Sequence, residues 1–151
     1  MTSPSPVEIF DGLHDLLHLF RTRTLDYVEL SHTELTLNEI RVLMYTGRNA
    51  GITQKDLVER SHTDKAQMTR ILAGLEDRDL LERRPSDSDR RVRCLRLSAK
   101  GAELFAQLRD VQDQIGGDLL RSLPLDVQKK MLNACQRACG KVGRVGNTRV
   151  G

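Results

Sequence analysis

The sequence has 151 residues, of which 38% are apolar, and a formal net charge of +3. This length suits a single domain spanning residues 1–151 with one hydrophobic core, and the apolar content argues against a disordered chain. No run approaches the roughly 18 apolar residues of a membrane span, and the N-terminal MTSPSPVEIFDG lacks the basic start and apolar block of a secretory signal. We therefore expect a cytoplasmic protein with no membrane partner.

Two helices are expected before residue 50. Residues 6–30 repeat apolar side chains at helical spacing, with Phe10, Leu13 and Leu17 on one face. A second helix follows Thr36, because Glu39 stands three residues later as in a capping box.

The next two predicted helices are short and joined by a tight turn. One starts at Thr53, and Asp64 caps the other, DKAQMTRILAGLEDRDL, with Gln67 at the capping-box position. This pattern is typical of a helix-turn-helix that binds double-stranded DNA. Gln and Arg can read base edges, whereas Lys and Thr can hold phosphates. The outer polar face of an ordinary helix would look similar. The candidate DNA-binding residues on this helix are Lys65, Gln67, Thr69 and Arg70.

A basic hairpin is predicted next. LLERRP reads as the outgoing strand, SDSD as the turn and RVRCLRLS as the return strand. Residues 53–101 hold 12 Lys/Arg and 9 Asp/Glu, so the entire surplus of positive charge lies there. Such a cluster is either a solvated face or a surface that meets phosphates. The candidate DNA contacts on the hairpin are Arg90, Arg91 and Arg93.

In this order, the segments resemble the multiple antibiotic resistance regulator (MarR) family over residues 6–142. The hairpin residues that carry the resemblance are Asp87, Asp89, Arg90, Arg91, Leu97, Ser98 and Gly101. Ser98 replaces the threonine usual in the family, and either hydroxyl can cap the following helix.

The resemblance implies a mainly α fold with a small β-hairpin wing (α+β). A winged helix-turn-helix at about 36–101 would be flanked by dimerisation helices at about 6–30 and 102–142, with 143–151 as a flexible tail. It also implies that Arg90 enters the minor groove, whose negative potential attracts a guanidinium. Asp87 or Asp89 would hold the wing arginines by bidentate pairing, or else would only form the turn.

The last two predicted helices begin at Ser98 and after Pro124. Their apolar faces are not needed by the DNA-reading unit, and a two-fold homodimer would bury them. Gly116 and Gly117 suggest a bend or a close helix contact. The resemblance implies the same dimer, acting as a repressor on a pseudo-palindromic operator and released by a small aromatic or phenolic ligand. The interface residues expected are Phe10, Leu13, Leu17, Leu132, Cys135 and Cys139.

Other functions are less well supported. His14 and His18, four residues apart on one helix, could bind a metal together, but no acidic residue or cysteine follows at the spacing of a known metal-binding motif. The three cysteines suit packing, although Cys94 beside Arg93 and Arg96 could act as a redox sensor. The sequence lacks the motifs of common enzymes, so we predict no catalytic residue, metal or cofactor. A winged helix used for protein contacts is the remaining alternative.

Overall fold

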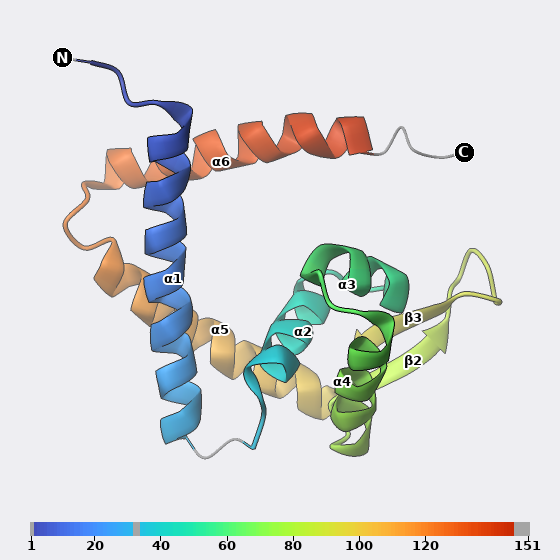
Figure 1. Ribbon diagram of the computed structural model, residues 1–151. Coiled ribbons are helices and arrows are strands. Elements are labelled where there is room, and N and C mark those ends of the chain that lie inside the picture. The colour runs from blue at the N-terminus through green and yellow to red at the C-terminus, as the bar shows by residue number, and fades with distance from the viewer. Residues whose placement is uncertain (1, 32–33, 147–151) are drawn as a thin grey trace. The chain divides into compact units, whose positions relative to one another are not determined.

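In the computed structural model of the chain, the described backbone comprises residues 2–31 and 34–146 (Figure 1). Over those ranges no helix is both long and apolar enough to cross a bilayer. The elements are α1 (Pro6–Leu30), α2 (Leu37–Arg48), β1 (Ile52–Thr53), α3 (Gln54–Ser61), α4 (Lys65–Asp77), β2 (Leu81–Pro85), β3 (Arg93–Leu97), α5 (Ala99–Leu119) and α6 (Leu125–Gly146).

The chain divides into two compact units, residues 1–113 and 114–151, with the boundary inside α5. The first unit holds α1 to α4, the sheet and most of α5. The second holds the end of α5 and all of α6.

The caps predicted at Thr36 and Asp64 are confirmed, and Thr53, predicted only as a helix start, also acts as a cap. The Thr36 hydroxyl accepts a hydrogen bond from the Glu39 backbone N–H at 3.2 Å, and the Glu39 carboxylate accepts the Thr36 N–H in return. Thr53 forms the same reciprocal pair with Asp56. At α4, Asp64 Oδ1 accepts the backbone N–H of Gln67 at 2.8 Å. These bonds satisfy backbone donors that a helix leaves unpaired in its first turn.

The sheet contains one strand that the sequence pattern did not reveal. Its order is β1-β3-β2, all antiparallel, and Ile52 pairs with Leu95 in β3. A two-residue strand is too short to show alternation, and its partner lies more than forty residues further along the chain. The return strand starts at Arg93, two residues later than predicted, because Val92 N–H bonds Asp89 O within the turn.

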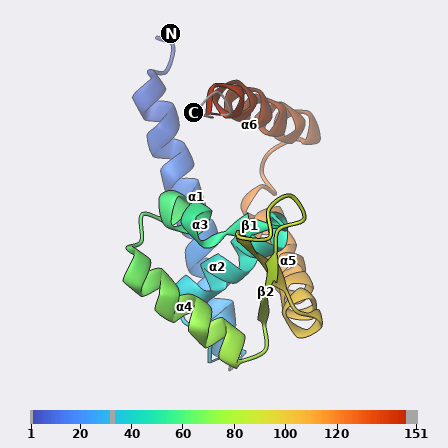
Figure 2. The ribbon, with the colours of Figure 1, turned by 90° about the vertical axis from the view of Figure 1, so that its right-hand side faces the viewer.

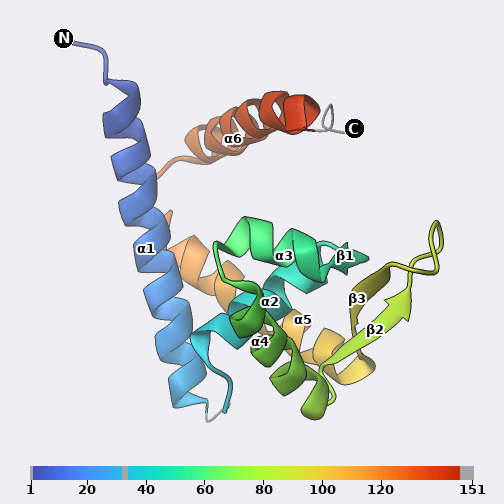
Figure 3. The ribbon, with the colours of Figure 1, turned by 45° about the vertical axis from the view of Figure 1, so that its right-hand side comes forward.

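The core lies between α2, α4 and the sheet. Leu43, Met68, Leu72, Leu75 and Leu95 are all almost completely buried there. Figures 2 and 3 show α4 beside the β2–β3 hairpin, which places the helix and the wing on one lobe.

The start of α5 is fixed against the turn after α4. Ser98 Oγ accepts the N–H of Gly101 at 3.0 Å, which confirms its capping role, and donates to Asp79 O. A Cβ at Gly101 would lie 2.0 Å from Leu80 O, so only glycine fits. The hydroxyl and the glycine that carried part of the resemblance therefore dock α5 on the winged lobe.

The C-terminal prediction requires a correction. Residues 143–146 continue α6 and are not a tail, whereas 147–151 lie outside the described residues. Glycine lowers helix stability by only about 1 kcal/mol relative to alanine, so isolated glycines need not end a helix. Among the described residues, a Cβ at Gly117 would meet no atom within 4 Å, so the close helix contact suggested there is not seen within residues 114–146.

Candidate nucleic-acid interface

The helix α4 presents the predicted polar face to solvent. Lys65, Gln67, Thr69 and Arg70 are exposed, while Met68, Ile71, Leu72 and Leu75 form its buried stripe. Burial of the stripe fixes which side of the helix faces outward, so the four polar side chains cluster around its N-terminal half.

Two alanines on the same surface were missed by sequence reasoning. Ala66 and Ala73 are both exposed and flank Arg70 at helical spacing. Small side chains allow a helix to approach a DNA groove closely, and an alanine methyl can contact a thymine methyl. The signal available in the sequence was the presence of small residues within an otherwise polar face.

Gln54 in α3 connects α4 to the wing, and it too was missed. Its Nε2 donates to Thr69 Oγ1 at 2.9 Å, and its Oε1 accepts from Arg83 Nη1 at 3.3 Å. Arg83 Nε also donates to Glu76 Oε1 in α4 at 2.6 Å. Thr69 Oγ1 itself donates to Lys65 O, so the hydroxyl is already engaged. In this state Thr69 helps to position α4, and its hydroxyl proton is not free for a phosphate.

The strand register divides the wing arginines between two faces. Arg83 lies opposite Leu95, whose side chain is in the core, and Arg93 shares that face because alternate residues of a strand point the same way. Arg93 is therefore on the side of the hairpin that carries α4. The opposite face holds Arg84, Cys94 and Arg96.

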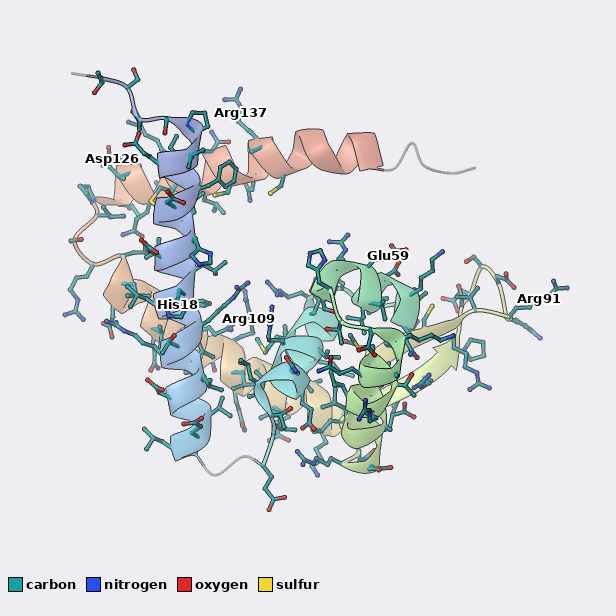
Figure 4. All side chains as sticks on the ribbon, in the orientation of Figure 1. His18, Glu59, Arg91, Arg109, Asp126 and Arg137 are labelled. Carbon is teal, nitrogen blue, oxygen red and sulfur yellow. The ribbon has the colours of Figure 1, made fainter. Side chains whose placement is uncertain are left out.

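The wing tip is rich in exposed arginine. Arg90, Arg91 and Arg93 are exposed, and Figure 4 shows Arg91 projecting from the tip. Arg90 lines an open concavity together with Arg84 and Arg96. Arg84 and Arg96 lie on the face of the hairpin away from α4, whereas Arg93 lies on the side of α4. Exposed guanidinium groups at the tip of a wing can meet one part of a duplex while the polar face of α4 meets another.

The aspartates do not pair with the wing arginines in this structure. Asp89 Oδ1 instead accepts the backbone N–H of Arg91 at 3.0 Å, and neither Asp87 nor Asp89 forms an ion pair within the described residues. Both carboxylates are exposed. Water screens an ion pair between an exposed aspartate and an exposed arginine, so such a pair is weak. The backbone N–H of Arg91 is held near Asp89 by the turn, so this hydrogen bond forms instead. Of the two roles considered for these aspartates, pairing with arginine or forming the turn, Asp89 has the second.

The cysteines and histidines do not form a second site. Cys94 is half-buried. Of the two arginines expected beside it, Arg96 shares its face of the strand and Arg93 does not. Cys135 and Cys139 are exposed, so they are not core residues of the single chain. His14 and His18 are also exposed, and no group of three or more candidate metal ligands occurs in the part of the chain that the structure describes.

The residues assigned to a dimer interface are unburied in the single chain. Phe10, Leu13 and Leu17 in α1 are exposed, as is Leu132 in α6. Exposed large apolar side chains at helical spacing are typical of a surface that another chain covers. The dimer itself stays a prediction.

A cavity of about 620 Å³ lies within the first unit. It is lined by α1, α2, α3 and α5. Two of its residues, His18 of α1 and Arg109 of α5, are labelled in Figure 4. Because α3 precedes α4, a ligand here would touch the helix-turn-helix.

These features define a winged helix-turn-helix. Residues 33–92 match the model of the MarR family. Among solved structures, a MarR protein is 24% identical, with 98% of each chain covered and a TM-score of 0.69. A MarR transcriptional regulator from Methanosarcina mazei Go1 is 20% identical, with 91% of this chain and 97% of that chain covered and a TM-score of 0.71. No curated protein sequence matches the chain.

The chain is therefore similar to the MarR family over residues 33–92, and it shares the fold of solved MarR proteins over nearly its whole length. Its fold is that of the family's transcriptional regulators.

Proposed function

We propose that the chain is a homodimeric transcriptional repressor that binds a pseudo-palindromic operator and is released by a small aromatic or phenolic ligand. The observation that carries the DNA-binding part is the exposed polar face of α4 beside an arginine-rich wing. Gln67 and Arg70 would read base edges in the major groove, Lys65 would hold a phosphate, and Arg90 would enter the minor groove.

The dimer follows from the uncovered apolar side chains of α1 and α6. A two-fold pair would bury them and present two copies of α4 to successive turns of the duplex. The repeat in the operator would then mirror the symmetry of the protein.

Release by a ligand is supported by the position of the cavity. Leu57 and Arg60 of α3 line it, and α3 is tied to α4 by the bond between Gln54 and Thr69. A ligand that prefers one placement of α3 would therefore shift the population of the DNA-binding state.

The test is operator binding by purified protein. DNA fragments selected from a random pool supply the operator, and affinity is then measured against salt. The affinity of the wild type for the operator should fall steeply as salt rises, because phosphate contacts release counterions, whereas a winged helix used for protein contacts would show no such slope.

Arg90→Ala should cost about 1–3 kcal/mol in operator binding. Gln67→Ala should reduce the preference for operator over random DNA.

Arg121→Ala is the matched control, since it removes one exposed positive charge outside the winged lobe. Its affinity for the operator should be close to that of the wild type. Equal losses in Arg90→Ala and Arg121→Ala would show a nonspecific charge effect and reject the wing contact.

A further inference from the structure

A closed ring of hydrogen bonds joins α4, α3 and the hairpin. Gln54 of α3 donates to Thr69 Oγ1 of α4 at 2.9 Å and accepts from Arg83 Nη1 of β2 at 3.3 Å. Arg83 Nε donates in turn to Glu76 Oε1 at 2.6 Å, which returns the ring to α4. Thr69 and Glu76 stand at i and i+7, so they lie on one side of the helix. The ring therefore holds α4 at two separate points along its length.

The ring requires the amide of Gln54. Thr69 Oγ1 gives its proton to Lys65 O, so towards Gln54 it can only accept, and the amide must present Nε2 to it. A guanidinium has donors only, so the amide must present Oε1 to Arg83. A glutamate at this position could not donate, and a leucine could neither donate nor accept. Both neighbours thus fix the orientation of one amide group.

The ring lies at the middle of the strands, and the tip of the wing lies beyond it. Arg83 pairs with Leu95, which is almost completely buried in the core. Figures 1 and 3 show the turn between β2 and β3 projecting away from α4. Apolar packing is not directional, whereas a hydrogen bond has a preferred angle, so the ring restricts a rotation of α4 that the core alone would allow. A small rotation there would change the distance between the polar face of α4 and the wing tip.

We propose that Gln54 is a positioning residue that fixes the angle between α4 and the wing. The chain would thereby select DNA by the spacing between the bases that α4 reads in the major groove and the narrow minor groove that receives the wing. Gln54 would act through Thr69 and Arg83 and touch no base itself. The inference rests on the proposed function for its DNA partner, but the angle itself can be measured without DNA.

Residual dipolar couplings of the backbone N–H groups in α4 and in the β2–β3 hairpin measure this angle in the free protein. In the wild type, the couplings of both elements should fit one common alignment. Gln54→Leu keeps a side chain of similar size but removes both hydrogen bonds, so the two elements should require separate alignments. Thr69→Val should have the same effect and provides a second way to open the ring. Thr69→Ser should retain the common alignment, because a serine hydroxyl can still accept from Gln54.

Gln128→Leu is the matched control. Gln128 is half-buried like Gln54, and its amide also takes part in two hydrogen bonds, to Leu120 O and Leu123 O. These bonds lie in the second unit, outside the winged lobe. Gln128→Leu should therefore leave the alignment of α4 and the hairpin, and the preference for DNA spacing, as in the wild type.

The spacing preference is measured on the operator obtained by selection. In a second duplex, the A·T-rich minor-groove element is moved by one base pair in both half-sites, while the bases in the major groove stay the same. The affinity of the wild type should fall by about tenfold on the shifted duplex, because the wing no longer meets its groove. The affinity of Gln54→Leu should fall by only about twofold between the two duplexes, because its wing can adjust. Adding Thr69→Val to Gln54→Leu should reduce the preference no further, since both changes break the same bond.

The proposal is overturned if Gln54→Leu and Thr69→Val keep the common alignment, if Gln128→Leu loses it as they do, or if Gln54→Leu retains the spacing preference of the wild type. Additive effects in the double variant would give Thr69 a DNA contact of its own and would also reject the shared route. If the wild type binds no DNA, the proposed function fails, while the couplings still decide whether Gln54 positions α4.

Discussion

The helices α4 and α6 have similar apolar stripes but bury them differently. Leu75 of α4 is 0% exposed because α2 and the sheet cover it, whereas Leu132 of α6 is 61% exposed. Both stripes repeat at helical spacing, so periodicity alone does not distinguish them. An apolar stripe shows that a helix face needs a partner, but it does not show whether that partner is in the same chain.

The largest expected effect tests this difference directly. Leu75→Ala should lower the free energy of unfolding by about 2–5 kcal/mol, because it leaves a cavity in a packed core. Leu132→Ala is the control, and its effect should depend on protein concentration if the residue lies in a subunit interface. Urea unfolding at two protein concentrations measures both. A loss for Leu132→Ala as large as that for Leu75→Ala, and independent of concentration, would contradict the distinction.

Two glycines of α5, Gly101 in the first unit and Gly117 in the second, differ in the same way: one is packed against a neighbour and the other is not. Gly101→Ala should destabilise the protein by about 1–3 kcal/mol or more, because its Cβ would clash with the Leu80 carbonyl. Gly117→Ala should stabilise it by up to about 1 kcal/mol, since the added methyl meets no neighbour. Thermal unfolding of the two variants gives the sign of each change. Destabilisation by Gly117→Ala would mean that another chain approaches this residue.

The smallest effect concerns the start of α1, which depends only on neighbouring residues. Hydrogen bonds from the backbone and then the side chain of Ser5 hold the pKa of Glu8 below its usual value of 4.5. A lowered pKa in the folded state means that the carboxylate stabilises the helix start above pH 4.5, and that this contribution is lost as the pH falls through the lowered value.

Backbone NMR shifts of residues 5–9 should therefore lose helical character in acid in the wild type. Glu8→Gln should show no such transition. An identical acid transition in both proteins would assign it to another group.

Sequence reasoning located the DNA-binding candidates but not the contacts that hold them. Lys65, Gln67 and Arg70 were recognisable because a cap and a buried stripe define the outward face of α4. Gln54 was not, since its partners Thr69 and Arg83 lie 15 and 29 residues away. Likewise, the pairing of Asp87 and Asp89 with the wing arginines could not be judged from proximity in the chain.

The sequence by itself determined the helix starts, the outward face of α4 and the basic composition of the wing. Each depends on interactions within a few residues, such as the caps at Thr36, Thr53 and Asp64. Only the tertiary structure decided the strand β1, the division of the wing arginines between two faces and the cavity that α1, α2, α3 and α5 line together. These features join residues far apart in the chain, whose proximity depends on how the buried faces of separate elements pack together.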